Sequence, residues 1–73
     1  MEYIEWKDKK YQEIPEQDRP QKGECFICLT ANSDDPFNDW DYCVGIVNVD
    51  GRARPVGLFK EICFARQFAM NIK

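Results

Sequence analysis

One continuous stretch, residues 43–70, constrains the fold most because it joins a strand pattern, a turn signal and a helix pattern. Its first part, CVGIVNV, is apolar and rich in β-branched residues, which is typical of a strand. The Asp50-Gly51 pair follows, and glycine readily adopts the positive φ that a tight hairpin turn requires. Pro55 and Gly57 then mark the entry to the apolar run VGLFKEICFARQFAM, which predicts a helix of about four turns.

The segment before this stretch predicts a second strand. Residues 24–31 (ECFICLTA) alternate between two faces, and both faces are apolar, as expected for a central strand. Residues 32–42 (NSDDPFNDWDY) predict a loop, because Pro36 interrupts any continuous strand. Together these patterns predict an α+β fold in which one C-terminal helix packs across a small antiparallel β-sheet. The expected core is Ile27, Leu29, Val44, Ile46, Val47, Ile62 and Phe68.

The N-terminal segment has two interpretations. Residues 2–14 (EYIEWKDKKYQEI) favour a hairpin that turns at Asp8-Lys9, with two cross-strand contacts, Trp6 with Tyr11 and Tyr3 with Ile14. The alternative is one amphipathic helix with an apolar stripe. The polar linker PEQDRPQKG follows at 15–23. We therefore expect a single domain over residues 1–73, with residues 1–22 as an arm that moves relative to the rest.

Composition and charge narrow the function. The chain has 73 residues and a net charge of −3. Residues 1–42 carry five bases against eleven acids, a net −6, and residues 43–73 carry five bases against two acids, a net +3. An acidic half argues against direct nucleic-acid binding, which depends on attraction to phosphates, and favours a basic protein surface as the partner. The sequence shows neither a signal-peptide pattern nor a membrane-length apolar run, so we expect a cytoplasmic protein with reduced thiols.

The catalytic residue types argue against an enzyme. The chain has no histidine, which excludes a Cys–His or Ser–His nucleophile pair. It has no glycine-rich phosphate loop, and its carboxylates cluster in polar loops where their pKa values would stay ordinary. The aspartates of the 34–41 loop lack the glycine and the closing glutamate of a calcium-binding EF-hand.

The cysteines leave one alternative open. Cys25 and Cys28 have the C-x-x-C spacing of half a zinc site, which Cys43 and Cys63 would have to complete. On an extended strand, however, Cys25 and Cys28 point to opposite faces, which works against a shared metal. We therefore expect four reduced, buried thiols and no cofactor. A small zinc-binding domain that mediates macromolecular interaction is the alternative.

As a whole, the chain resembles the small host-takeover proteins of lytic phages. The features that carry the resemblance are the EYIEW arm, the DDPFNDWDY loop and the apolar LFKEICFARQF segment. In size and character it is most similar to phage-encoded inhibitors of bacterial RNA polymerase. The resemblance implies binding to a polymerase subunit in the host cytoplasm, with altered promoter use or termination and no reaction chemistry.

The sequence therefore predicts a non-enzymatic protein-binding module, either a monomer or a weak homodimer, that inhibits or regulates a larger host enzyme. The chain has ten aromatic residues, more than so small a core can hide. Aromatic anchors dominate many interfaces, and flanking acids mainly speed and orient the encounter. The predicted partner-binding residues are Tyr3, Ile4, Glu5 and Trp6 in the arm, and Asp34, Asp35, Phe37, Asp39, Trp40 and Asp41 in the loop.

Overall fold

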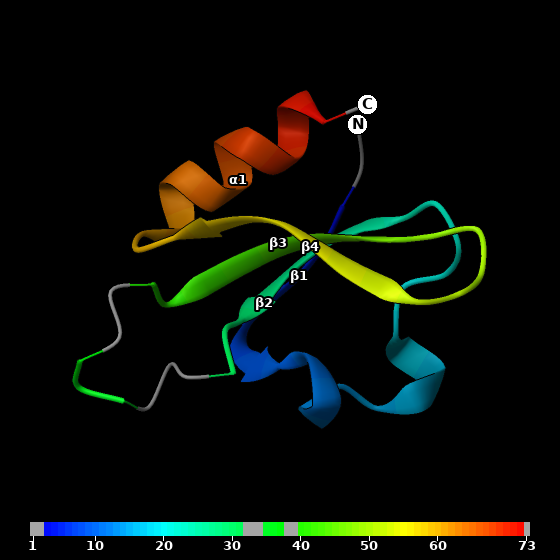
Figure 1. The fold of residues 1–73 in the computed structure, drawn as a ribbon, viewed down its shortest axis with the longest axis horizontal. Helices are drawn as coiled ribbons and strands as arrows, with labels where there is room; N and C mark the ends of the chain where they lie inside the picture. Colours follow the sequence, from blue (N-terminus) through cyan, green and yellow to red (C-terminus); the bar gives the residue numbers. More distant parts are fainter. Residues whose placement is uncertain (1–2, 32–34, 38–39, 73) are drawn as a thin grey trace.

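A computed structural model describes residues 3–31, 35–37 and 40–72, and these form a four-stranded sheet with one helix across one face (Figure 1). The strands lie in the order β1-β2-β3-β4. The predicted α+β arrangement, with a C-terminal helix packed on a small sheet, is confirmed. The sheet is mixed, because β1 pairs parallel to β2 while the other neighbours are antiparallel. The elements are β1 (Tyr3–Lys10), β2 (Cys25–Leu29), β3 (Tyr42–Val47), β4 (Ala53–Phe59), α1 (Ile62–Asn71) and the short 3₁₀ helices η1 (Tyr11–Glu13) and η2 (Glu16–Asp18).

The N-terminal segment differs from both interpretations of the sequence. It is neither a hairpin nor a helix, because β1 continues through Asp8-Lys9 and pairs with β2, with Tyr3 opposite Cys25 and Trp6 opposite Cys28 and with a register shift between Trp6 and Lys10. This pairing lets the alternating side chains of β1 pack on both faces of a larger sheet, whereas an isolated hairpin would be marginally stable. The segment 11–24 then crosses below the sheet, opposite α1, to reach β2 (Figure 1).

The strand β2, the strand β3 and the turn after β3 match the prediction. Strand β2 lies inside the sheet, as its two apolar faces indicated. Gly51 has a φ of +85°, and Asp50 Oδ1 accepts a hydrogen bond of 3.0 Å from the Arg52 amide. These contacts close the turn between β3 and β4.

The helix begins later than the sequence predicted. Residues Ala53–Phe59, which include the expected helix entry, form the edge strand β4, and α1 starts at Ile62. Pro55 is tolerated there because an edge strand leaves one row of backbone groups without a ladder partner. Val44 pairs with Gly57 while Gly45 pairs with Pro55, so Val56 is an extra, bulged residue.

Two apolar clusters hold the fold together, one on each face of the sheet. On the helix side, Cys25, Ile27 and Val44 pack against Ala65 and Ala69 of α1. On the opposite side the cluster is Ile14, Phe26, Cys28 and Val47. Of the predicted core, Ile27, Val44 and Val47 are buried, whereas Leu29, Ile46, Ile62 and Phe68 are partly buried. Ala65 and Ala69 are the fully buried residues of α1, and Ile62 and Phe68 pack at the edge of the same cluster.

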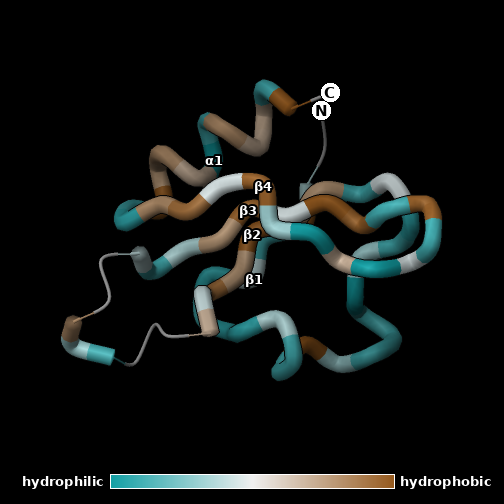
Figure 2. The backbone as a smooth tube through the Cα atoms, in the orientation of Figure 1, coloured by the Kyte–Doolittle hydropathy of each residue, from teal (hydrophilic) through white to brown (hydrophobic). Residues whose placement is uncertain are grey.

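The hydropathy of the chain follows this arrangement. The central strands are apolar, and the crossover between β1 and β2 is mostly hydrophilic (Figure 2).

Within residues 3–31, 35–37 and 40–72, no helix combines the length and the apolar character that crossing a membrane requires.

Candidate functional site

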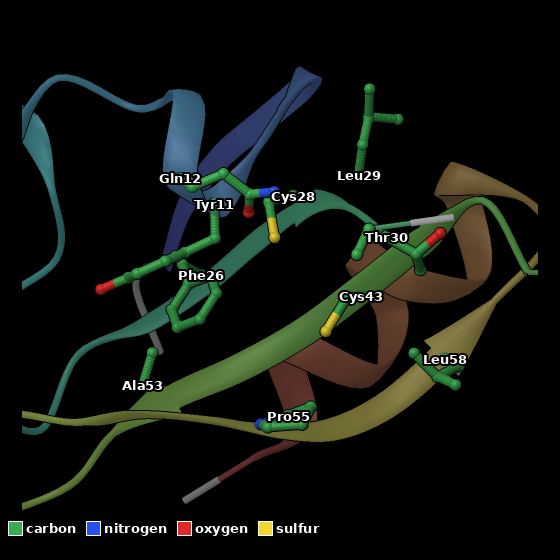
Figure 3. Close-up of a pocket in the computed structure, with 11 residues that line it drawn as sticks. Tyr11, Gln12, Phe26, Cys28, Leu29, Thr30, Cys43, Ala53, Pro55 and Leu58 are labelled. Atoms are coloured by element: carbon green, nitrogen blue, oxygen red, sulfur yellow. The ribbon is translucent and has the colours of Figure 1, made fainter. Parts of the chain in front are cut away.

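A hollow of about 330 Å³ opens on the helix-free face of the sheet (Figure 3). The helix α1 covers the other face, and residues 11–14 cover only part of this one. The uncovered part is mostly apolar, and its wall is formed by Tyr11, Phe26, Cys28, Cys43, Pro55 and Leu58. We call this feature the helix-free hollow.

The strand register explains why these side chains meet. Phe26 lies opposite Gly45, Cys28 opposite Cys43, and Cys43 opposite Leu58. Because alternate residues of a strand point to the same face, these residues form continuous rows across β2, β3 and β4. The extra residue Val56 shifts the side-chain alternation of β4 by one position, so that both Pro55 and Leu58 reach the hollow.

Gly45 is required for the shape of the hollow. A β-carbon at this position would overlap the ring of Phe26, lying 2.8 Å from Cε1. The ring of Phe26 therefore leans across β3 only because Gly45 has no side chain. The ring of Tyr11 packs against Phe26 with a centroid distance of 5.1 Å and an interplanar angle of 41°. These two rings form one wall.

The segment that carries Tyr11 is held in place by its own contacts. The guanidinium of Arg19 lies over the ring of Tyr11, 5.4 Å from the centroid, and its Nε donates to the carbonyl oxygen of Ile14 at 3.2 Å. Ile14 is 1% exposed and anchors the segment in the apolar cluster on the helix-free face. The Tyr11 wall is thus preorganised, which reduces the entropy lost on binding.

The loop that follows β2 returns beside the hollow. Leu29 and Thr30 line the hollow, and the Thr30 hydroxyl donates to the carbonyl oxygen of Trp40 at 2.8 Å. Trp40 is 47% exposed and Phe37 is 90% exposed. The backbone at Trp40 is therefore hydrogen-bonded to a residue that lines the hollow.

The structure separates the predicted partner-binding residues into two groups. Those of the arm lie in β1 and are partly buried. Tyr3 packs on the helix side, and Glu5 binds Arg66. Ile4 and Trp6 pack against the apolar cluster on the helix-free face. Those of the loop lie between β2 and β3: Asp35 accepts a hydrogen bond from the Phe37 amide at 2.9 Å, and the Asp41 carbonyl accepts one from the Thr30 amide at 3.0 Å. Asp34 and Asp39 fall outside the described residues.

Glu5 bonds to α1 and does not line the hollow. Its carboxylate accepts two hydrogen bonds from Arg66, at 2.7 and 2.8 Å, which tie the edge strand β1 to α1. The hydrogen bond from Arg66 lowers the pKa of Glu5, more than burial raises it. Sequence analysis missed this pair because the two residues are 61 positions apart.

The cysteines do not converge on one place. Cys25 is buried on the helix side, Cys28 and Cys43 face the hollow, and Cys63 is exposed on α1. In the part of the chain that the structure describes, no group of three or more acidic, cysteine or histidine side chains could hold a metal ion. A zinc site made from all four cysteines would require Cys25 to leave the helix-side core.

Cys28 and Cys43 form a pair that sequence analysis did not find. The contact with Cys43 raises the pKa of the Cys28 thiol, and burial raises it further. The same contact lowers the pKa of Cys43, because the Cys28 thiol donates toward the sulfur of Cys43. Cys43 is therefore the more readily ionised of the two. The pair becomes visible only with the strand register, which no local pattern specifies.

A second apolar patch lies on the outer side of α1. Its most exposed aromatic side chain is Phe64, which is 57% exposed. Phe64 lies beside Phe68, whose ring packs against Phe59 with a centroid distance of 5.2 Å. This patch is a rival interaction surface, on the opposite side of the sheet from the helix-free hollow.

Comparisons of the chain with models of protein families, with curated proteins and with solved structures returned no match. The interpretation of the site therefore depends on its own geometry and chemistry.

Proposed function

We propose that this chain is a non-enzymatic protein-binding module that acts in the cytoplasm and inhibits or regulates a larger enzyme, such as bacterial RNA polymerase. One observation carries the proposal: an apolar, preorganised hollow lies open on the helix-free face, and Thr30 in its wall donates a hydrogen bond to the backbone of the half-exposed Trp40. Apolar pockets of this kind receive the anchor side chains that dominate protein interfaces.

The hollow is the centre of the proposed interface, but it is too small to be all of it. A stable interface buries about 800 Å² on each partner, which is roughly a sixth of the 5182 Å² surface of this chain. The neighbouring exposed side chains supply the remainder. Leu58 is 47% exposed and Val56 is 37% exposed on β4, and Trp40 in the loop before β3 is 47% exposed.

Charge favours a basic partner surface. Asp35 and Asp41 belong to the loop beside the hollow, and the first 42 residues carry five bases against eleven acids. Acids around an apolar centre speed and orient the encounter with a basic surface, while the apolar centre supplies the affinity. The residues that we assign to affinity are Phe37, Trp40 and Leu58.

The proposal is tested by direct binding to purified bacterial RNA polymerase. Leu58→Asp places a charge at the hollow, and Phe64→Asp makes the same change on the rival patch of α1. We expect Leu58→Asp and Trp40→Ala each to weaken binding by about thirtyfold or more, and Phe64→Asp to leave it within a factor of about two. Melting temperatures of all three variants separate lost binding from lost folding.

Two results would contradict the proposal in different ways. No binding of the unchanged chain to the polymerase would remove that enzyme as the partner. Loss of binding in Phe64→Asp with retention in folded Leu58→Asp would move the interface to α1.

A further inference from the structure

The two cysteines at the base of the helix-free hollow lie directly opposite each other on neighbouring strands. Cys28 of β2 and Cys43 of β3 are register partners (Figure 3). The Thr30 amide donates to the Asp41 carbonyl, so Thr30 and Asp41 form a hydrogen-bonded pair of the antiparallel ladder. Hydrogen-bonded pairs recur every two residues, so Cys28 and Cys43 form the next such pair. Cα atoms of such pairs are about 5.5 Å apart, inside the Cα range of a disulfide, and their Cβ atoms, about 5 Å apart, must approach each other by up to about 1 Å for the bond to close.

The hollow gives small reagents a route to this pair. Both side chains line it, and Cys43 is the more exposed of the two, since Cys28 is 3% exposed and Cys43 is half-buried. The remaining cysteines have no such arrangement. Cys25 is 0% exposed on the other side of the sheet, and Cys63 is exposed on α1 beside Glu61.

We propose that Cys28 and Cys43 form a two-thiol site that exchanges with small disulfides of the glutathione class and closes into a cross-strand disulfide. The sulfur of Cys43, as the thiolate, attacks one sulfur of the small disulfide. A mixed disulfide forms on Cys43, and the first small thiolate leaves. The sulfur of Cys28 then attacks the sulfur of Cys43, gives up its proton to the departing second thiolate, and closes the Cys28–Cys43 bond. The two protein thiols are oxidised, and one small disulfide is reduced to two small thiols.

This site is independent of the proposed function, because its test needs no partner. It also gives the hollow two chemical forms. In the reduced form two thiols line the hollow, and in the oxidised form a disulfide crosses it between β2 and β3.

The test uses the full chain with Cys63→Ser, which removes the exposed thiol of α1 without touching the hollow. The folded protein is treated with oxidised glutathione, the remaining thiols are alkylated, and the intact mass and digest are measured. We expect the loss of two of the three thiols that remain, no retained glutathione, and one digest fragment that joins the peptides of Cys28 and Cys43. Dithiothreitol should restore all three thiols.

A second variant traps the intermediate. With Cys28→Ser added, the reaction should stop at one glutathione on Cys43, and with Cys43→Ser added, Cys28 should stay unmodified because it is buried. The proposal is overturned if the folded Cys63→Ser protein keeps all three thiols, if the bond involves Cys25, or if the bond forms only after unfolding with urea. These outcomes need only the Cys63→Ser protein, so a failure of the double variants to fold does not affect the decision.

Discussion

At the scale of single residues, Gly45 determines whether the helix-free hollow can exist. A methyl group at this position would collide with the ring of Phe26. We expect Gly45→Ala to lower the free energy of unfolding by roughly 1–3 kcal/mol, the usual cost of overpacking a close-packed site. Urea denaturation measures the change. The cost should shrink in a Phe26→Leu background, where the smaller side chain leaves space; an equal cost in both backgrounds would show that Phe26 is not the cause.

The ion pair between Glu5 and Arg66 predicts a pH-dependent contribution to stability. Arg66 holds the pKa of Glu5 below its ordinary value of 4.5 in the folded state. Because the folded-state pKa is the lower one, the contribution is present above pH 4.5 and is lost as the pH falls through the folded-state value.

We therefore expect Glu5→Gln to lower the midpoint of urea unfolding at neutral pH and to match the unchanged chain in acid. The effect should be small and should weaken in salt, since the two side chains are 25% and 41% exposed. Glu16→Gln, at an exposed position of η2, is the control. A difference that persists at acid pH would assign the effect to the shape of Glu5 rather than to its charge.

At the scale of elements, α1 docks on the sheet through small side chains. Ala65 and Ala69 are both 0% exposed against the helix-side cluster. We expect Ala65→Leu to destabilise the chain by roughly 1–3 kcal/mol, because the larger side chain pushes α1 away from the sheet. Gln67→Leu, on the exposed side of α1, is the matched control and should have little effect. Equal effects of the two changes in thermal unfolding would contradict this docking.

The strand that pairs with β1 distinguishes the observed fold from the hairpin that the sequence favoured. In solution, nuclear Overhauser contacts across the β1–β2 ladder should join Tyr3 with Cys25 and Trp6 with Cys28. A hairpin would instead join Trp6 with Tyr11 and Tyr3 with Ile14. Observation of the second set without the first would contradict the fold at this edge of the sheet.

Local patterns account for what the sequence predicted correctly. The strand at Cys25–Leu29, the strand at Tyr42–Val47 and the Asp50-Gly51 turn depend on alternation and on the backbone freedom of glycine, which neighbouring residues reveal. The helix start was placed too early because the apolar segment 56–59 suits a strand as well as a helix, and pairing with β3 decides between them.

Long-range pairing accounts for what the sequence did not show. The partner of β1 lies across a crossover of fourteen residues, from Tyr11 to Glu24, and no local pattern distinguishes parallel pairing with β2 from a hairpin. The same holds for the helix-free hollow, whose walls come from β2, β3, β4 and residues 11–14. Its Phe26–Gly45 and Cys28–Cys43 contacts depend on strand register, which tertiary packing fixes.

At the scale of the whole molecule, the two sides of the sheet have different roles in this account. Helix α1 closes one side with a packed core, while the other side keeps the helix-free hollow open beside the acidic, aromatic loop. We propose that the helix side stabilises the fold and that the helix-free side binds the partner.

Hydrogen–deuterium exchange of the chain, alone and saturated with purified bacterial RNA polymerase, locates the surface that the partner covers. We expect slower exchange in the complex at residues 29–31 and 53–58, which border the helix-free hollow, and unchanged exchange at residues 62–71 of α1. Slower exchange confined to α1, or no change anywhere when the polymerase is saturating, would contradict it.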